Sequence, residues 1–132
     1  SLKRLLSTIL RKDTTPTCLH NILKHLGKWL NASTSHRRSW MIEVYRDMLN
    51  NYYEYLLELS EKGVDAGTME GFGKVVSELI PRCTDPEEDV RKNSLGCVQM
   101  LLRIHLCYRG YLDESDNLVD AISRLEDRAS KS

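Results

Sequence analysis

The chain has 132 residues and a mass of 15.2 kDa, a size that fits one domain or one fragment of a repeat array. Hydrophobic residues make up 41% and charged residues 29% of it, a composition that excludes intrinsic disorder. Nineteen basic residues balance nineteen acidic ones. We expect no nucleic-acid partner, because nucleic-acid-binding modules carry a basic excess. No apolar run approaches the roughly 18–20 residues that cross a bilayer, so we expect no transmembrane span.

The four cysteines, Cys18, Cys83, Cys97 and Cys107, form no CxxC pair and lie inside apolar, periodic segments. A secreted disulfide scaffold of this size has more cysteine and more loop sequence. We therefore interpret them as reduced thiols packed as small hydrophobic groups, and we expect a cytoplasmic protein. A helical pattern begins directly after Ser1 without an initiator Met, so we expect residues 1–132 to be a fragment of a longer chain.

Apolar residues recur with helical spacing, and no segment alternates with the period of two that marks a strand. Thr14 and Thr15 before Pro16 predict a capped helix start, and Gly63 predicts a helix end. The spacing predicts helices over residues 2–12, 16–31, 36–62, 69–83, 86–109 and 116–129. We therefore expect an all-α fold of about six helices.

The third of these helices, residues 36–62, has a broader apolar arc than a surface helix, which usually buries one stripe of about 100°. Such an arc indicates a helix with neighbours on two sides. It favours a stack of helical hairpins over a closed bundle, in which each helix buries a single stripe. The arc consists of Trp40, Met41, Val44, Tyr45, Met48, Leu49, Tyr52, Tyr55, Leu56 and Leu59. Trp29 is likewise assigned to the buried face of the helix over residues 16–31.

The strongest local signal is Asp85-Pro86-Glu87-Glu88. It predicts Asp85 as the N-cap, Pro86 as the first helical residue, and Glu88 as the residue that returns the capping bond. On the helix that follows, Lys92, Gly96, Gln99 and Arg103 are expected on the solvent side, opposite an apolar stripe.

The segment from Leu79 to Leu102 resembles one HEAT repeat. The matching positions are Leu79-x-Pro81, Asp85-Pro86, Asp89-Val90-Arg91 and Cys97-Val98-x-x-Leu101. The run from 26 to 108 resembles, more narrowly, the maestro heat-like repeat proteins. That resemblance rests on Leu26-Gly27-x-x-Leu30, Ser35-His36-Arg37-Arg38 and Phe72-Gly73-Lys74-Val75-Val76. Residues 31–39 depart from the HEAT pattern, since they contain neither Asp-Pro nor Val-Arg.

The resemblance implies a right-handed superhelical stack of HEAT/armadillo-like hairpins that binds proteins and has no catalytic activity. We expect the repeat-motif residues Pro81, Asp85, Pro86, Asp89, Val90 and Arg91 to serve turn and capping geometry. Arg91 is expected to pair with an acidic residue of an adjacent repeat.

Two surfaces are candidates for binding. His36, Arg37 and Arg38 near a helix N-terminus could contact a phosphate, an acidic peptide or an anionic lipid. The alternative is that acidic residues of a neighbouring turn neutralise them, or that the helix starts later, near Ser39. The second candidate is a partner ridge on the third and fifth helices, formed by Arg46, Tyr53, Lys92, Gln99 and Arg103, with Tyr53 the most exposed aromatic residue.

The motifs of catalysis do not occur. No cysteine and histidine spacing suits a metal, no nucleophile-bearing loop precedes a cysteine, and Gly71-Phe72-Gly73 lacks the residues of a phosphate loop. We therefore expect no cofactor and no enzyme, but a non-enzymatic protein–protein interaction scaffold with unidentified protein partners. The alternative function is a regulatory module that binds anionic ligands or membrane surfaces through residues 36–38. A homodimer through the uncapped repeat ends is also expected.

Overall fold

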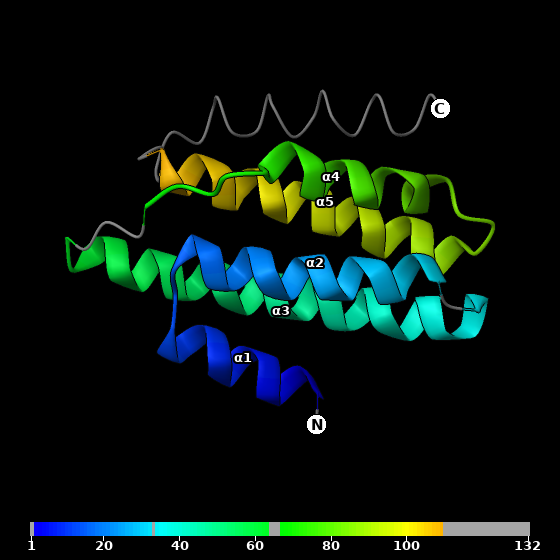
Figure 1. The fold of residues 1–132 in the computed structure, drawn as a ribbon, viewed down its shortest axis with the longest axis horizontal. Helices are drawn as coiled ribbons and strands as arrows, with labels where there is room; N and C mark the ends of the chain where they lie inside the picture. Colours follow the sequence, from blue (N-terminus) through cyan, green and yellow to red (C-terminus); the bar gives the residue numbers. More distant parts are fainter. Residues whose placement is uncertain (1, 33, 64–66, 110–132) are drawn as a thin grey trace.

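The computed structural model describes residues 2–32, 34–63 and 67–109. They form α1 (Leu2–Lys12), α2 (Pro16–Ala32), α3 (Ser35–Glu61), α4 (Phe72–Leu79), a 3-10 helix η1 (Ile80–Thr84) and α5 (Glu88–Tyr108) (Figure 1). This described part is all-helical, without a strand. The helix expected over 116–129 lies outside the described residues.

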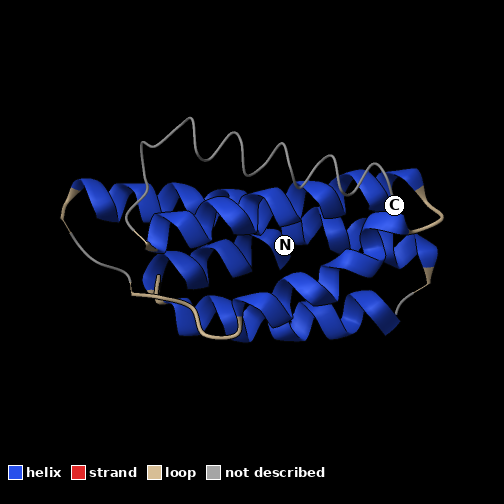
Figure 2. Cartoon of the chain, turned by 90° about the horizontal axis from the view of Figure 1, so that it is seen from above, coloured by secondary structure: helices blue, strands red, loops and turns tan. Residues whose placement is uncertain are grey.

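Helices α1, α3 and α5 run parallel to one another (Figure 1). The ion pair Lys3–Asp47 and the hydrogen bond Ser7–Asn51 join residues of α1 and α3 that are 44 positions apart. This constant offset is possible only between parallel helices in register. Helix α5 contacts the other side of α3. Helices α2 and α4 pack against each other and complete a two-by-two arrangement with α3 and α5, seen as two rows in Figure 2.

The core centres on α3, which packs against α1, α2 and α5. Its buried side chains are Met41, Ile42, Val44, Tyr45, Met48, Leu49, Tyr52 and Leu56. The expectation that this helix has neighbours on two sides is confirmed, because α1 and α5 lie on opposite flanks. The described residues form an all-helical stack of hairpins; the right-handed sense of its superhelix stays a prediction.

Helix α4 begins and ends differently from the predicted range 69–83. It starts at Phe72, because Gly71 before it has φ +78°, a left-handed conformation that cannot continue a right-handed helix. After Leu79 the chain tightens into η1. Pro81 lies in this segment, and proline has no N–H to donate to the carbonyl four residues earlier.

Both tryptophans are more exposed than predicted: Trp29 is 58% and Trp40 49% exposed. Gly27 lies against Glu78 of α4, and two residues further on Trp29 has turned about 200° around the helix, away from α4. Trp40 is two turns of α3 before Asp47, where α1 begins to cover this flank. The apolar pattern of the sequence predicted which face of each helix is buried. It did not show how far along that face a neighbouring helix extends.

Three segments meet at the hydroxyl group of Tyr52. This group donates a hydrogen bond to the carbonyl oxygen of Thr14, at 2.8 Å, in the connection between α1 and α2. Its single proton is thereby used, so the Tyr108 hydroxyl of α5 is the donor in the short contact between the two tyrosines. Tyr52 is fully buried. It therefore joins α3 to α5 and to the start of α2 at one end of the stack.

We expect Tyr52→Phe to lower the free energy of unfolding by about 2–3 kcal/mol, because it leaves the Thr14 carbonyl and the Tyr108 hydroxyl without this partner. Tyr108→Phe removes one bond and strands no carbonyl, so about 1 kcal/mol is expected. Urea unfolding followed by circular dichroism measures both. Equal losses in the two variants would contradict this ordering.

Candidate partner-binding surfaces

The stack has two helical hairpins, one formed by α2 and α3 and the other by α4 and α5. The carboxylate of Asp85 is fully buried between them. Arg38, in the first turn of α3, donates from Nε to Oδ2 at 2.8 Å and from Nη2 to Oδ1 at 3.3 Å. Arg82 of η1 donates to Oδ2 at 2.7 Å, and the backbone N–H of Glu87 donates to Oδ1 at 3.0 Å. We call these three side chains, Arg38, Arg82 and Asp85, the carboxylate clasp.

Burial of Asp85 opposes ionisation and by itself raises the pKa of its carboxyl group. The hydrogen bonds from Arg38 and from the Glu87 amide, with the charges of Arg38 and Arg82, outweigh it and lower the pKa below the ordinary value. Asp85 is therefore ionised at neutral pH. The clasp connects the N-terminal turn of α3 to the turn before α5.

The clasp corrects two predictions. Asp85 is not the N-cap of α5, which begins at Glu88 after Glu87; its carboxylate closes a tight turn on the Glu87 amide and binds the two arginines instead. Within the residues that the structure describes, Arg91 forms no ion pair with an acidic residue of another repeat; it donates to the carbonyl oxygens of Asp85 (2.9 Å) and Pro86 (3.1 Å). The ion pair between hairpins is Arg38–Asp85.

The remaining repeat-motif residues lie where turn geometry places them. Pro81 is exposed in η1, Asp89 is exposed in the first turn of α5, and Val90 is fully buried. Glu88, predicted to return a capping bond, pairs instead with Lys92 at 3.0 Å, with both side chains well exposed.

The basic segment 36–38 is divided by the structure. Arg38 is half-buried against Asp85, whereas His36 and Arg37 are exposed. His36 lines a hollow of about 460 Å³ together with Ser39, Trp40, Glu43, Asp89 and Asn93. An acidic turn therefore neutralises Arg38, as the alternative predicted. The three basic side chains do not converge on one site.

The predicted ridge is only partly outward-facing. Lys92 is exposed, whereas Tyr53, Gln99 and Arg103 are half-buried. Arg46 lies in the seam between α3 and α5, where it donates to Oδ1 of Asn93 at 3.0 Å. Its guanidinium covers Gly96, where a Cβ atom would come within 2.7 Å of Cζ. Gly96 is thus a point of close helix approach and not a solvent-side residue.

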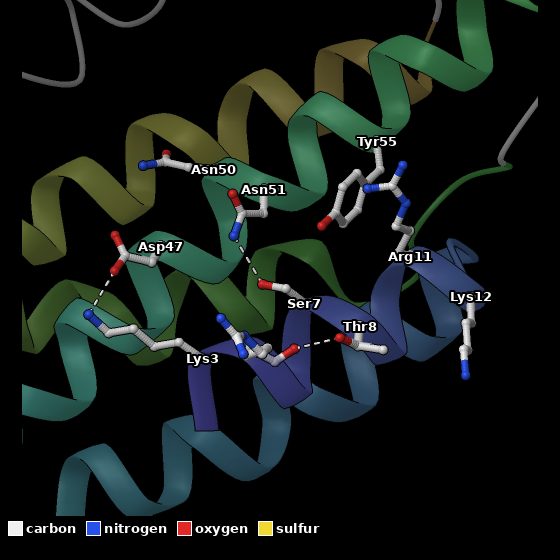
Figure 3. Close-up of a pocket in the computed structure, with 10 residues that line it drawn as sticks. Lys3, Ser7, Thr8, Arg11, Lys12, Asp47, Asn50, Asn51 and Tyr55 are labelled. Atoms are coloured by element: carbon white, nitrogen blue, oxygen red, sulfur yellow. Dashed lines mark hydrogen bonds and ion pairs between the residues drawn. The ribbon is translucent and has the colours of Figure 1, made fainter. Parts of the chain in front are cut away.

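The structure also forms a polar groove of about 610 Å³ between α1 and α3, which the sequence reasoning missed. Its walls bear hydroxyl, amide and charged side chains, and Figure 3 shows the pairs Lys3–Asp47 and Ser7–Asn51 bridging the two helices. The guanidinium of Arg11 lies 5.3 Å from the ring centre of Tyr55. The residues that line the groove are Lys3, Arg4, Ser7, Thr8, Arg11, Lys12, Asp47, Asn50, Asn51 and Tyr55. The available signal was α1 itself, which has four basic residues and no acidic one.

The described residues hold no group of three or more His, Cys, Asp or Glu side chains that could bind a metal ion. All four cysteines are unpaired. Burial raises the pKa of the Cys97 thiol, the most enclosed of them, and so disfavours the reactive thiolate. In this part of the chain no helix is long and apolar enough to span a membrane.

Residues 36–132 match the family described as "Maestro, HEAT repeats". The chain is similar to Maestro heat-like repeat-containing protein family member 1 of Mus musculus, with 29% identity over 96% of this chain and 8% of the relative. The protein of the same name from Dictyostelium discoideum is 32% identical over 79% of this chain and 6% of its own length. The chain thus spans less than a tenth of these relatives. No solved structure matches it.

We expect Asp85→Asn to lower the free energy of unfolding by about 2–4 kcal/mol at pH 7, because it leaves two partly buried guanidinium groups without their carboxylate. The folded-state pKa of Asp85 is depressed, so its stabilisation is complete above the ordinary pKa of 3.8 and is lost as the pH falls through the folded-state pKa. The difference between the variant and the wild type should therefore shrink in acid.

Denaturant titrations between pH 7 and pH 2 measure this difference. Glu88→Gln is the matched control, since it removes the exposed Glu88–Lys92 pair, whose loss is expected to change the stability far less because solvent screens an exposed pair. A constant difference at all pH values would show that Asp85 acts by its shape and not by its charge.

Proposed function

Since the chain belongs to the Maestro HEAT-repeat family, we propose that it is a non-enzymatic scaffold for protein–protein interaction. The observation that carries the proposal is the burial of α3 between α1 and α5. These three parallel helices form one layer, whose outer face is ordered before any partner arrives. A partner that docks on a pre-ordered face has little protein entropy to overcome.

The outer face of this layer is polar. Glu43, Asn50 and Glu54 follow one another at helical spacings of seven and four residues, so they form one stripe along α3. This stripe lies between the flank that meets α1 through Asp47 and the flank that meets α5 through Arg46. Glu43 and Glu54 are exposed. The surface therefore suits partners recognised by charge and hydrogen bonding.

The alternative, binding of anionic ligands or membrane surfaces through residues 36–38, has less support. Arg38 pairs with Asp85, which leaves His36 and Arg37 as the exposed basic residues of that segment. For the cellular location we propose the cytoplasm, on the strength of four unpaired cysteines.

We expect photo-cross-linking from the outer face of the α1–α3–α5 layer to capture discrete partner proteins in a cell extract. A photoreactive amino acid replaces Glu54 on α3 or Lys92 on α5, and the controls carry it at Lys24 or Lys28 of α2, which are also exposed. Adducts should form from the first pair of positions and not from the second. Equal adducts from both faces, or none from either, would contradict the proposal.

We also propose self-association through the exposed apolar side chains of α1, supported by the exposure of Leu5 (57%) and Ile9 (40%) on that helix. Sedimentation velocity should show a dimer whose population rises with concentration. Changing both residues to glutamate should give a monomer at every concentration, because the apolar contact would bury charge. A wild type that stays monomeric throughout would refute self-association.

A further inference from the structure

We propose that the groove between α1 and α3 binds an extended, acidic polypeptide segment. The inference rests on the proposed scaffold function and names one surface of it together with the chemistry of its partner. The groove combines a concave shape, a concentration of basic side chains and several hydrogen-bonding side chains in one place.

The charge of the groove favours an acidic ligand. Four cations line the groove, Lys3, Arg4, Arg11 and Lys12, against the single carboxylate of Asp47. The chain as a whole has no net charge, so this concentration is local. It comes from α1, which has no acidic residue to offset its four basic ones. A concave surface of one sign attracts ligands of the opposite sign and guides their approach.

The spacing of the cations along α1 favours an extended ligand. The cations form two pairs, Lys3 with Arg4 and Arg11 with Lys12. The centres of the pairs are eight residues apart on a helix, or about 12 Å at a rise of 1.5 Å per residue. An extended chain covers that distance in about four residues. Two acidic clusters four residues apart in an extended segment would therefore meet both pairs of cations at once.

The groove also offers hydrogen-bonding side chains. The backbone N–H and C=O groups of an extended segment need partners. Asn50 and Asn51 line the groove, and an amide side chain supplies both a donor and an acceptor.

The same features disfavour other anionic partners. A membrane surface cannot enter a groove between two helices. A nucleic acid would bring an unbroken row of phosphates past Asp47, and beside it Glu43, whose charge also acts on Lys3. A peptide can place neutral residues opposite the carboxylate. The Asp47 contact therefore favours a polypeptide whose acidic residues are interrupted.

The test uses fluorescence anisotropy with the 132-residue chain and a labelled peptide that has two glutamate pairs four residues apart. We expect saturable binding that weakens as salt is added. Arg4→Glu with Arg11→Glu should weaken binding about tenfold or more. The matched control, Lys24→Glu with Lys28→Glu, makes the same charge change on α2, outside the groove, and should change the Kd less than twofold. Circular dichroism shows that each variant is folded, and Arg4→Gln with Arg11→Gln replaces the first pair should it unfold.

A gain of affinity gives an independent readout. Asp47→Asn removes the one carboxylate of the groove and releases Lys3 from its ion pair, so binding should tighten several-fold. Asp89→Asn removes an exposed carboxylate of α5 and should have no such effect.

Three results would overturn the inference: no saturable binding by the wild type, equal weakening by the α2 control, or binding of phosphatidylserine vesicles or an oligouridylate in preference to the peptide. Each is distinguishable from failure of the scaffold function. Cross-links from Glu54 and Lys92 without peptide binding would remove only the groove as the site, whereas absence of both would remove the scaffold as well.

Discussion

One buried carboxylate fixes how the two hairpins meet. The carboxylate of Asp85 loses its hydration when it is buried between the hairpins. Only well-placed hydrogen-bond donors and opposite charges offset this free-energy cost. Arg38 comes from the start of α3 and Arg82 from the 3-10 helix before α5, so the carboxylate sets the first turns of the two parallel helices relative to each other. The Tyr52–Tyr108 contact does the same at the opposite end. Between the two ends, the seam contains the Arg46–Asn93 hydrogen bond and the fully buried Cys97, whose Sγ lies 4.0 Å from the carbonyl oxygen of Ile42.

The two flanks of α3 differ in how closely they are packed. On the α5 side Gly96 allows the guanidinium of Arg46 to lie directly against the helix backbone, so this seam is closed. On the α1 side the helices are bridged by the polar pairs Lys3–Asp47 and Ser7–Asn51, and a groove remains. Helix α3 therefore packs closely against α5 on one flank and forms one wall of the proposed binding groove on the other. The side chains of each flank determine which of these roles it has.

Local patterns in the sequence predicted most of the fold. The broad apolar arc of α3 predicted neighbours on two flanks, and Thr15 before Pro16 predicted the start of α2, where its hydroxyl group accepts the Cys18 N–H at 3.3 Å. The role of Asp85 was not predictable in this way, because a carboxylate before a proline suits a helix cap equally well. The partner that decides between the two, Arg38, is 47 residues away in the chain. The groove was not predicted for a similar reason. Helices α1 and α3 form it from distant parts of the sequence, and neither helix has a motif that indicates a groove.

The 44-residue offset between α1 and α3 bears on how this sequence can change in length. One residue inserted within either helix would rotate every later side chain by about 100°. Lys3, Ser7 and Arg11 would then no longer face their counterparts on α3. Evolution can therefore add or remove residues in the connections between helices far more readily than within them, and homologous repeats should keep their helix lengths while their linkers diverge.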